Sequence, residues 1–176
     1  MGSALDAAGQ SALARQYYDR GLVKNPDAFA FMARARLQEE KGAVLSDIRK
    51  AMALPNVSSS ALGMAGKVLF DRKWYREALE VFTWYDEEKG SSFRIIGMRG
   101  IARWQLGDKA GATKDFAAAR DLVPSEQFLN ELCWEKATFN VALEEALKDC
   151  DAALAALPAC NACKDSRAFV LLRSGR

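Results

Sequence analysis

Apolar residues between Ser92 and Pro124 recur at helical spacing on both sides of the pair Gly107-Asp108. This pattern predicts a helix, a turn and a second helix. Gly107 suits the left-handed backbone that ends a helix, and Asp108 can cap the amide groups of the helix that follows. Pro124 comes after the second helix, where a proline cannot continue it. The segment is therefore predicted to be an antiparallel helical hairpin.

The same pattern returns along the chain with a fixed period. Ala78, Ala112 and Ala146 follow one another at intervals of 34 residues (112 − 78 = 34), and Pro124 and Pro158 keep the same step. The same period therefore relates residues on helix faces and residues at helix ends, and a chance recurrence of alanine does not explain both. We therefore predict a repeat array of helical hairpins.

The repeat register covers the whole chain, 1–176, as a single array. The predicted units are a half repeat at 1–26, repeats at 27–55, 59–90, 92–124 and 126–158, and a half repeat at 161–176. Arrays normally end in a helix with a polar outer face, whereas Phe169 to Leu172 fill much of the last predicted helix with apolar side chains. We therefore expect a fragment of a longer protein, or terminal helices that associate with one another.

The hairpin at 92–124 resembles the tetratricopeptide repeat family. The resemblance is carried by Gly100, Gly107-Asp108, Ala112, Phe116, Ala119 and Pro124. It implies an all-α fold, a right-handed superhelical solenoid of antiparallel helical hairpins, and the alanine-rich repeats look bacterial. The unit at 126–158 departs from the family pattern, because Trp134 and Cys150 stand at the glycine and phenylalanine places. This departure suggests a locally altered spacing of the two helices.

Composition and charge narrow the range of partners. The chain has 176 residues, of which 50% are hydrophobic, and 25 Lys and Arg against 23 Asp and Glu give a formal net charge of +2. No long block of one sign appears, so a nucleic-acid partner receives no support. No apolar run approaches the roughly 20 residues that cross a bilayer, so no membrane span is expected. The compartment stays open between cytoplasm and periplasm.

The cysteines offer the one motif with possible chemistry. Cys160 and Cys163 form a C-x-x-C pair, a spacing that suits a disulfide, a redox couple or half of a zinc site. The chain has no histidine, so zinc would need Cys133 and Cys150 as well, which we expect to be small core side chains. We expect a Cys160–Cys163 disulfide or free thiols and no resident metal. Thioredoxin-like activity is disfavoured because no βαβ pattern surrounds the motif.

Catalysis finds no support elsewhere in the chain. The carboxylates at 86–88 are best explained as a solvated helix end, because no oxygen-rich loop of alternating ligands follows them. The sequence contains no glycine-rich phosphate loop, no nucleophile with a histidine partner and no dinucleotide fingerprint. The protein is therefore not expected to be an enzyme or to hold a cofactor.

The resemblance implies a partner-binding groove lined by the first helix of each hairpin. The outward residues of those helices are predicted to be Met64, Lys67, Arg94, Met98, Ile101, Trp104, Gln105, Glu131, Glu135 and Thr138. For Met98, Ile101 and Trp104, packing between repeats is the alternative. It stays open because a register error of one residue rotates a helical side chain by about 100°.

The predicted function is a protein–protein interaction scaffold that binds another protein, through a peptide or a helix, or another domain of its own parent chain in this groove. One alternative is a regulatory or substrate-presenting appendage of an enzyme whose catalytic domain lies outside these residues. Another is a self-assembly module that stacks through its terminal helices. A stack of repeats presents long surfaces, so the choice depends on surface chemistry.

Overall fold

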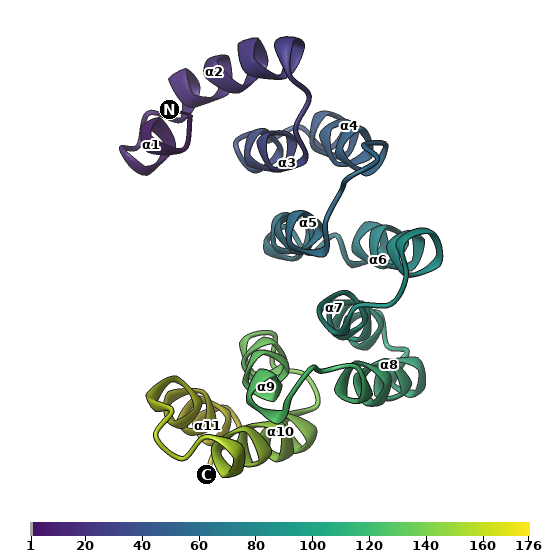
Figure 1. Ribbon diagram of the computed structural model, residues 1–176, viewed down its shortest axis with the longest axis vertical. Helices are drawn as coiled ribbons and strands as arrows, with labels where there is room; N and C mark the ends of the chain where they lie inside the picture. Colours follow the sequence, from purple (N-terminus) through teal and green to yellow (C-terminus); the bar gives the residue numbers. More distant parts are fainter. Residues whose placement is uncertain (1) are drawn as a thin grey trace. The chain divides into compact units, whose positions relative to one another are not determined.

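The computed structural model describes residues 2–176, and over this range the protein is all-helical, with no β-strand (Figure 1). The helices are α1 (Gly2–Ala7), α2 (Ser11–Lys24), α3 (Ala28–Arg36), α4 (Lys41–Met52), α5 (Ser59–Asp71), α6 (Tyr75–Lys89), α7 (Phe93–Gln105), α8 (Lys109–Asp121), α9 (Leu129–Thr138), α10 (Leu143–Ala156) and α11 (Asn161–Arg173). A short 3₁₀ turn, η1 (Glu126–Phe128), precedes α9. The predicted helical class is confirmed.

The helices form two compact units. The first ends at Trp74 and contains α1 to α5, and the second runs from Tyr75 to Arg176 and contains α6 to α11. In the first unit, α3 packs against α2, α4 and α5. In the second unit, α7 packs against α6, α8 and α9, and α9 also packs against α10 and α11. In both units, therefore, helices pack against neighbours in the chain, and α3, α7 and α9 each also pack against the helix two further along.

The predicted ends of the central hairpin are confirmed. Gly107 has a φ of +90°, the left-handed backbone that glycine adopts without steric cost, and it follows Leu106, the residue that caps the end of α7. The Asp108 carboxylate accepts a hydrogen bond from the Gly111 amide at 2.8 Å. It thereby satisfies one of the amide groups that the first turn of a helix leaves without a partner.

The alanines that carry the 34-residue register lie in the core. Ala78, Ala112 and Ala146 have no accessible surface. Phe82 and Phe116, one helical turn after Ala78 and Ala112, are also buried. Small side chains let two helices approach closely, while the larger aromatic rings fill the space that remains. The period in the sequence therefore marks helix–helix contacts.

The two helices of the central hairpin approach each other closely where Phe116 meets Gly100. A Cβ atom built on Gly100 would lie 2.6 Å from Cε1 of the Phe116 ring and 3.2 Å from Cβ of Asp115. Phe116 is buried, so its ring cannot move aside without disturbing the core. We expect Gly100→Ala to lower the free energy of unfolding by about 1–3 kcal/mol, measured by urea unfolding.

Gly63 provides the matched control for this substitution. It also lies inside a helix, α5, but a Cβ atom there would meet nothing within 4 Å. Alanine is the better helix former by about 1 kcal/mol, so we expect Gly63→Ala to leave the stability unchanged or to raise it. Equal losses in both variants would contradict the assignment of Gly100 to a close helix contact.

Candidate partner-binding face

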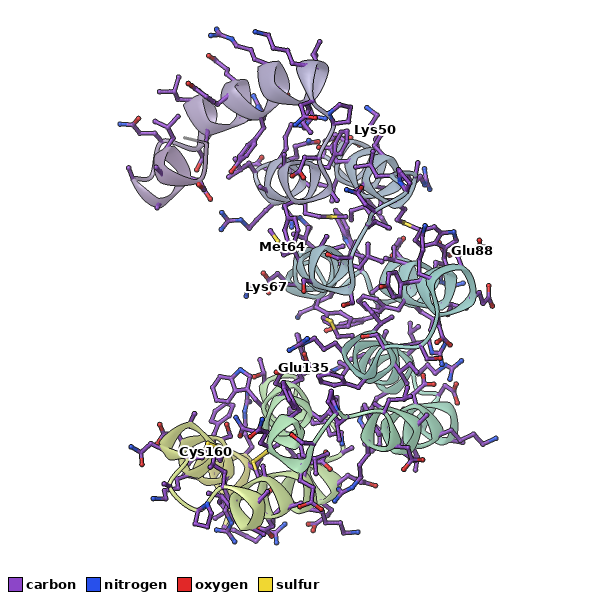
Figure 2. All side chains as sticks on the ribbon, viewed as in Figure 1. Lys50, Met64, Lys67, Glu88, Glu135 and Cys160 are labelled. Atoms are coloured by element: carbon purple, nitrogen blue, oxygen red, sulfur yellow. A yellow bond between two sulfur atoms is a disulfide. The ribbon has the colours of Figure 1, made fainter. Side chains whose placement is uncertain are left out.

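The predicted binding residues fall on three helices. Arg94, Met98, Ile101, Trp104 and Gln105 lie on α7, and Glu131, Glu135 and Thr138 lie on α9, all in the second unit. Met64 and Lys67 lie on α5 in the first unit, where Met64 is half-buried and Lys67 is exposed (Figure 2). The Lys67 ammonium is 3.9 Å from the Asp71 carboxylate, one turn further along the same helix.

Three of the predicted residues contribute packing within the second unit. Ile101 is 1% exposed and Met98 is 7% exposed, so neither presents an accessible side chain. Trp104 is half-buried, its ring centroid lies 6.4 Å from that of Phe116, and the Lys109 ammonium lies over it. For Met98 and Ile101, the structure favours the packing alternative over the binding groove, since α7 has helices on several sides.

An ion pair joins α7 to α9. The Arg94 guanidinium donates two hydrogen bonds to the Glu131 carboxylate, with N···O distances of 2.6 and 2.7 Å. This hydrogen-bonded pairing raises the pKa of Arg94 above its usual value. Arg94 also lies 4.9 Å from the centre of the Phe93 ring. The planar fork fixes both side chains, which therefore present a nearly neutral, structured patch.

Side chains also join the ends of these helices. The Gln105 amide nitrogen donates to the Phe139 carbonyl at 3.0 Å, just after the end of α9. Arg173, at the end of α11, donates to the Thr138 carbonyl at 3.3 Å. Each of these carbonyls lies at a helix end, where the last carbonyl groups have no hydrogen-bond donor within the helix. Thr138 itself remains exposed.

Glu135 has an unusual environment on the side of α9 that faces α7 (Figure 2). Its Oε2 atom is buried and has no hydrogen-bond partner among residues 2–176, and it lies 3.6 Å from the position of a Cβ built on Gly97. Burial, and secondarily the charge of Glu131, raises the pKa of Glu135 to about 8, while Arg94 and Lys136 act in the opposite direction. Glu135 is therefore protonated at neutral pH.

The raised pKa makes stability depend on pH. In the unfolded chain Glu135 loses its proton near 4.5, whereas in the folded protein it does so near 8, so stability falls as pH rises between these values. A glutamine side chain has no titratable proton, so Glu135→Gln removes this dependence of stability on pH. We expect the variant to be more stable than the parent above the folded pKa by up to a few kcal/mol, because one pKa unit corresponds to about 1.4 kcal/mol.

Urea unfolding of both proteins across this pH window measures the effect. The difference between parent and Glu135→Gln should shrink toward the acid end of the window. Glu126→Gln serves as the comparison, since the Glu126 side chain is exposed in the turn before α9. A constant difference across the window would contradict the burial of a neutral Glu135 carboxyl.

An aromatic pair borders the same side of α9 as Thr138. Trp134 is 48% exposed, and its ring centroid lies 5.3 Å from that of Phe169 on α11. The Arg173 guanidinium lies 5.1 Å from the centre of the Phe169 ring. The sequence pattern marks Trp134 only as a departure from the repeat, because Gly100 stands at the same place 34 residues earlier, and does not predict it as a binding residue. The signal available in the sequence was a tryptophan at the place where the preceding repeat has the small Gly100.

We define the α7–α9 face as six exposed or half-buried residues of these two helices. They are Arg94, Gln105, Glu131, Trp134, Glu135 and Thr138. The face combines an accessible indole, an internally paired arginine and glutamate, and a neutral carboxyl. These groups can take part in apolar contact and hydrogen bonding.

Buried ion pairs recur in the repeat register, and sequence reasoning missed them. Asp47, Asp115 and Asp149 are each 3% exposed or less. Asp149 follows Asp115 by 34 residues, and Asp115 follows Asp47 by twice that (115 − 47 = 68). Each pairs with cations of the preceding helix or hairpin. The partners are Arg34 for Asp47, Arg99 and Arg103 for Asp115, and Arg120 and Lys136 for Asp149.

The first unit contains a polar cavity of about 680 Å³. Its walls come from α2, α3 and α4, and the Arg34–Asp47 pair lies in them. Gln38 donates to Asp47 at 2.6 Å, and its own Oε1 atom is buried without a partner in the described part of the chain. The lining carries charges of both signs, so the cavity has no clear preference for a cation or an anion.

All four cysteines are paired in two disulfides. Cys160 bonds to Cys163, and Cys133 on α9 bonds to Cys150 on α10. The predicted core positions of Cys133 and Cys150 are confirmed, and the bond between them is a feature that the sequence pattern does not predict. Cys150 takes the place that Phe116 has one repeat earlier (150 − 116 = 34), so a covalent bond replaces an aromatic contact between the two helices. A four-cysteine zinc site would require both disulfides to be reduced.

Comparisons with protein-family models and with curated proteins identify no relative. No model of a protein family matches the chain, and no curated protein matches it.

Within residues 2–176, no helix has the length and apolar character needed to cross a membrane. The same residues contain no group of three or more metal-ligating side chains arranged around a common point.

Proposed function

We propose that the protein is a tetratricopeptide-like array that acts as a protein–protein interaction scaffold and has no catalytic activity of its own. The helix pairing supports this proposal. In each of three predicted repeats the two helices pack together, as α3 with α4, α7 with α8 and α9 with α10. First helices of successive repeats also pack against one another, as α7 with α9 and α9 with α11. A right-handed solenoid stacks its repeats in this way.

The observation that carries the proposed function is the exposed Trp134 on the α7–α9 face. A tryptophan supplies a large contact area at low entropic cost, and such residues are often the anchors of protein interfaces. Its neighbours offer little net charge, because Arg94 is paired with Glu131 and Glu135 is protonated below pH about 8. We therefore propose that the partner is a peptide or helix that places an apolar side chain against Trp134 and Phe169.

Selection from a displayed library of random peptides tests this proposal. We expect the selected peptides to share an apolar anchor residue, and Trp134→Ala to weaken their binding by about tenfold or more, the usual effect of losing an interface anchor. Leu122→Ala is the matched control, since Leu122 follows α8 and is exposed to a similar degree, 43% against 48% for Trp134. Peptides that bind both variants and the parent equally would refute the assignment of this face.

Met98→Ala and Trp104→Ala are poor probes of binding. Met98 is buried and Trp104 packs on Phe116, so their truncation would weaken the fold as well as any interface.

The appendage and self-assembly alternatives remain predictions. Leu172, on the last turn of α11, is 73% exposed and is the residue whose replacement by glutamate would test self-assembly.

The disulfides bear on the compartment. Disulfides persist in oxidising environments and are rare in the cytoplasm, where thiols are kept reduced. Two of them in this chain favour the periplasm over the cytoplasm among the compartments left open by the sequence. Alkylation of intact cells before lysis checks this. Alkylated cysteines in the recovered chain would show a reduced, cytoplasmic protein.

A further inference from the structure

We propose that the Cys160–Cys163 disulfide is an exchange site for external thiols, and that Cys160 is the sulfur that an incoming thiol attacks. The reagent class is a small thiol or a protein cysteine. The Cys133–Cys150 disulfide does not take part and serves as a structural crosslink. This proposal is independent of the partner-binding function, because it concerns α11 and its first residues alone.

The two disulfides differ in accessibility. Cys160 is half-buried and precedes α11, where Figure 2 labels it, whereas Cys163 is 1% exposed. Cys133 and Cys150 both have no accessible surface and lie in a core cluster with Ala137. Exchange requires a thiolate to reach one of the bonded sulfurs, so access favours Cys160.

The start of α11 stabilises a thiolate on Cys160, the sulfur that leaves when the mixed disulfide with the incoming thiol is resolved. Cys160 is the residue that caps the helix, and its Sγ atom accepts a hydrogen bond from the Cys163 amide at 3.0 Å. The helix has 13 residues, and its first turn contains no acidic side chain that would repel a thiolate. Amide groups at a helix start favour a negative charge, which makes a cysteine there both a better leaving group and a more available thiolate.

Chain connectivity points the same way. Cys160 and Cys163 are separated by 3 positions, whereas Cys133 and Cys150 are separated by 17. A crosslink that closes a short loop removes less conformational entropy from the unfolded chain than one that closes a long loop. Reduction of Cys160–Cys163 therefore costs the fold less, and this bond can open and close while the folded structure is kept.

The exchange is balanced with the thiol as the only co-reactant. A glutathione thiolate attacks Sγ of Cys160, the Cys160–Cys163 bond breaks, and the Cys163 sulfur leaves with the electron pair and takes up a proton. The product is a mixed disulfide between glutathione and Cys160. A second glutathione thiolate then attacks the glutathione sulfur of this mixed disulfide, and its bond to Cys160 breaks. The Cys160 sulfur leaves with the electron pair and takes up a proton, so oxidised glutathione is released and both cysteines are reduced. Two thiols are oxidised and one protein disulfide is reduced.

Timed reduction of the oxidised full chain with glutathione tests the proposal. Samples are quenched with an alkylating reagent, and the modified cysteines are identified by peptide mass. We expect Cys160–Cys163 to open at least about tenfold faster than Cys133–Cys150, with glutathione attached to Cys160 as the first adduct. Equal rates, faster opening of Cys133–Cys150, or a first adduct on Cys163 would overturn the proposal.

Two single substitutions provide matched variants. Cys163→Ser leaves the Cys160 thiol unpaired, and Cys160→Ser leaves the Cys163 thiol unpaired while it keeps a good capping residue before α11. We expect the Cys160 thiol to form a disulfide with oxidised glutathione about tenfold faster or more than the Cys163 thiol does. Equal reactivity would contradict the assignment of Cys160. Far-ultraviolet circular dichroism checks folding, and should either variant unfold, the timed reduction of the parent chain decides.

Discussion

Replacing Asp149 by asparagine should lower the free energy of unfolding by about 3–5 kcal/mol, the range observed when one partner of a buried ion pair is removed. Asp149 is 1% exposed, and its Oδ2 atom lies 2.5 Å from the Lys136 ammonium. Lys136 is itself buried and lies 4.7 Å from the centre of the Phe116 ring. Asparagine has nearly the same shape but no charge, so it would leave the ammonium buried without a counterion.

An earlier repeat of the same chain suggests the residues for a control variant. Two repeats before Lys136 and Asp149, the same register places hold Val68 and Val81 (136 − 68 = 68 and 149 − 81 = 68). We expect the double variant Lys136→Val, Asp149→Val to recover most of the stability lost in Asp149→Asn, because it removes both charges together. Arg120 also contacts Asp149, but its side chain is 42% exposed and water can solvate it.

Urea unfolding of the three proteins distinguishes the explanations. A double variant as unstable as Asp149→Asn would show that the packing of these side chains, rather than an uncompensated charge, dominates the loss. A loss below about 1 kcal/mol in Asp149→Asn would mean that the pair behaves as a surface ion pair does. Both results would contradict the proposed role of the buried pair.

Removing the Cys133–Cys150 disulfide should lower the free energy of unfolding by about 3 kcal/mol, from the loss of the loop constraint on the unfolded chain. The bond links α9 to α10 across 17 positions, and both sulfurs are in the core. The double variant Cys133→Ala, Cys150→Ala keeps small apolar side chains in that core. The shift of the unfolding midpoint in urea at unchanged slope measures the effect.

The second disulfide is the internal comparison. Cys160 and Cys163 are only 3 positions apart, so the corresponding loss on replacing both by alanine should be about half as large, near 1.5 kcal/mol. Equal losses for the two pairs would show that the entropy of loop closure does not account for their contributions. A change in the slope of the urea curve would instead indicate a change in the unfolded state.

The repeat pattern in the sequence predicted most of the local structure. Gly107 and Asp108 end and start helices as expected, and each complete predicted repeat contains two helices. These features depend on short stretches of chain, because a capping hydrogen bond or a left-handed glycine involves residues only a few positions apart. The helical class follows from the same periodicity.

The candidate site was predicted less completely. Arg94, Glu131 and Thr138 lie on an accessible face of α7 and α9, but Ile101 and Met98 are buried, and the exposed Trp134 was not among the predicted binding residues. In a stack of helices, each first helix touches neighbours on several sides. Hydrophobic periodicity shows which side of a helix is apolar, but it does not show how many neighbours cover it.

The amino-acid order therefore sufficed for the helices, their ends and the repeat period, because each arises from contacts within one turn or one hairpin. Tertiary packing decided which charges are buried, as for Asp149 with Lys136, and which cysteines pair, as for Cys133 with Cys150. It also decided the burial of Glu135 beside Gly97. Such features depend on the distance and angle between whole helices, which all the side chains between them determine jointly.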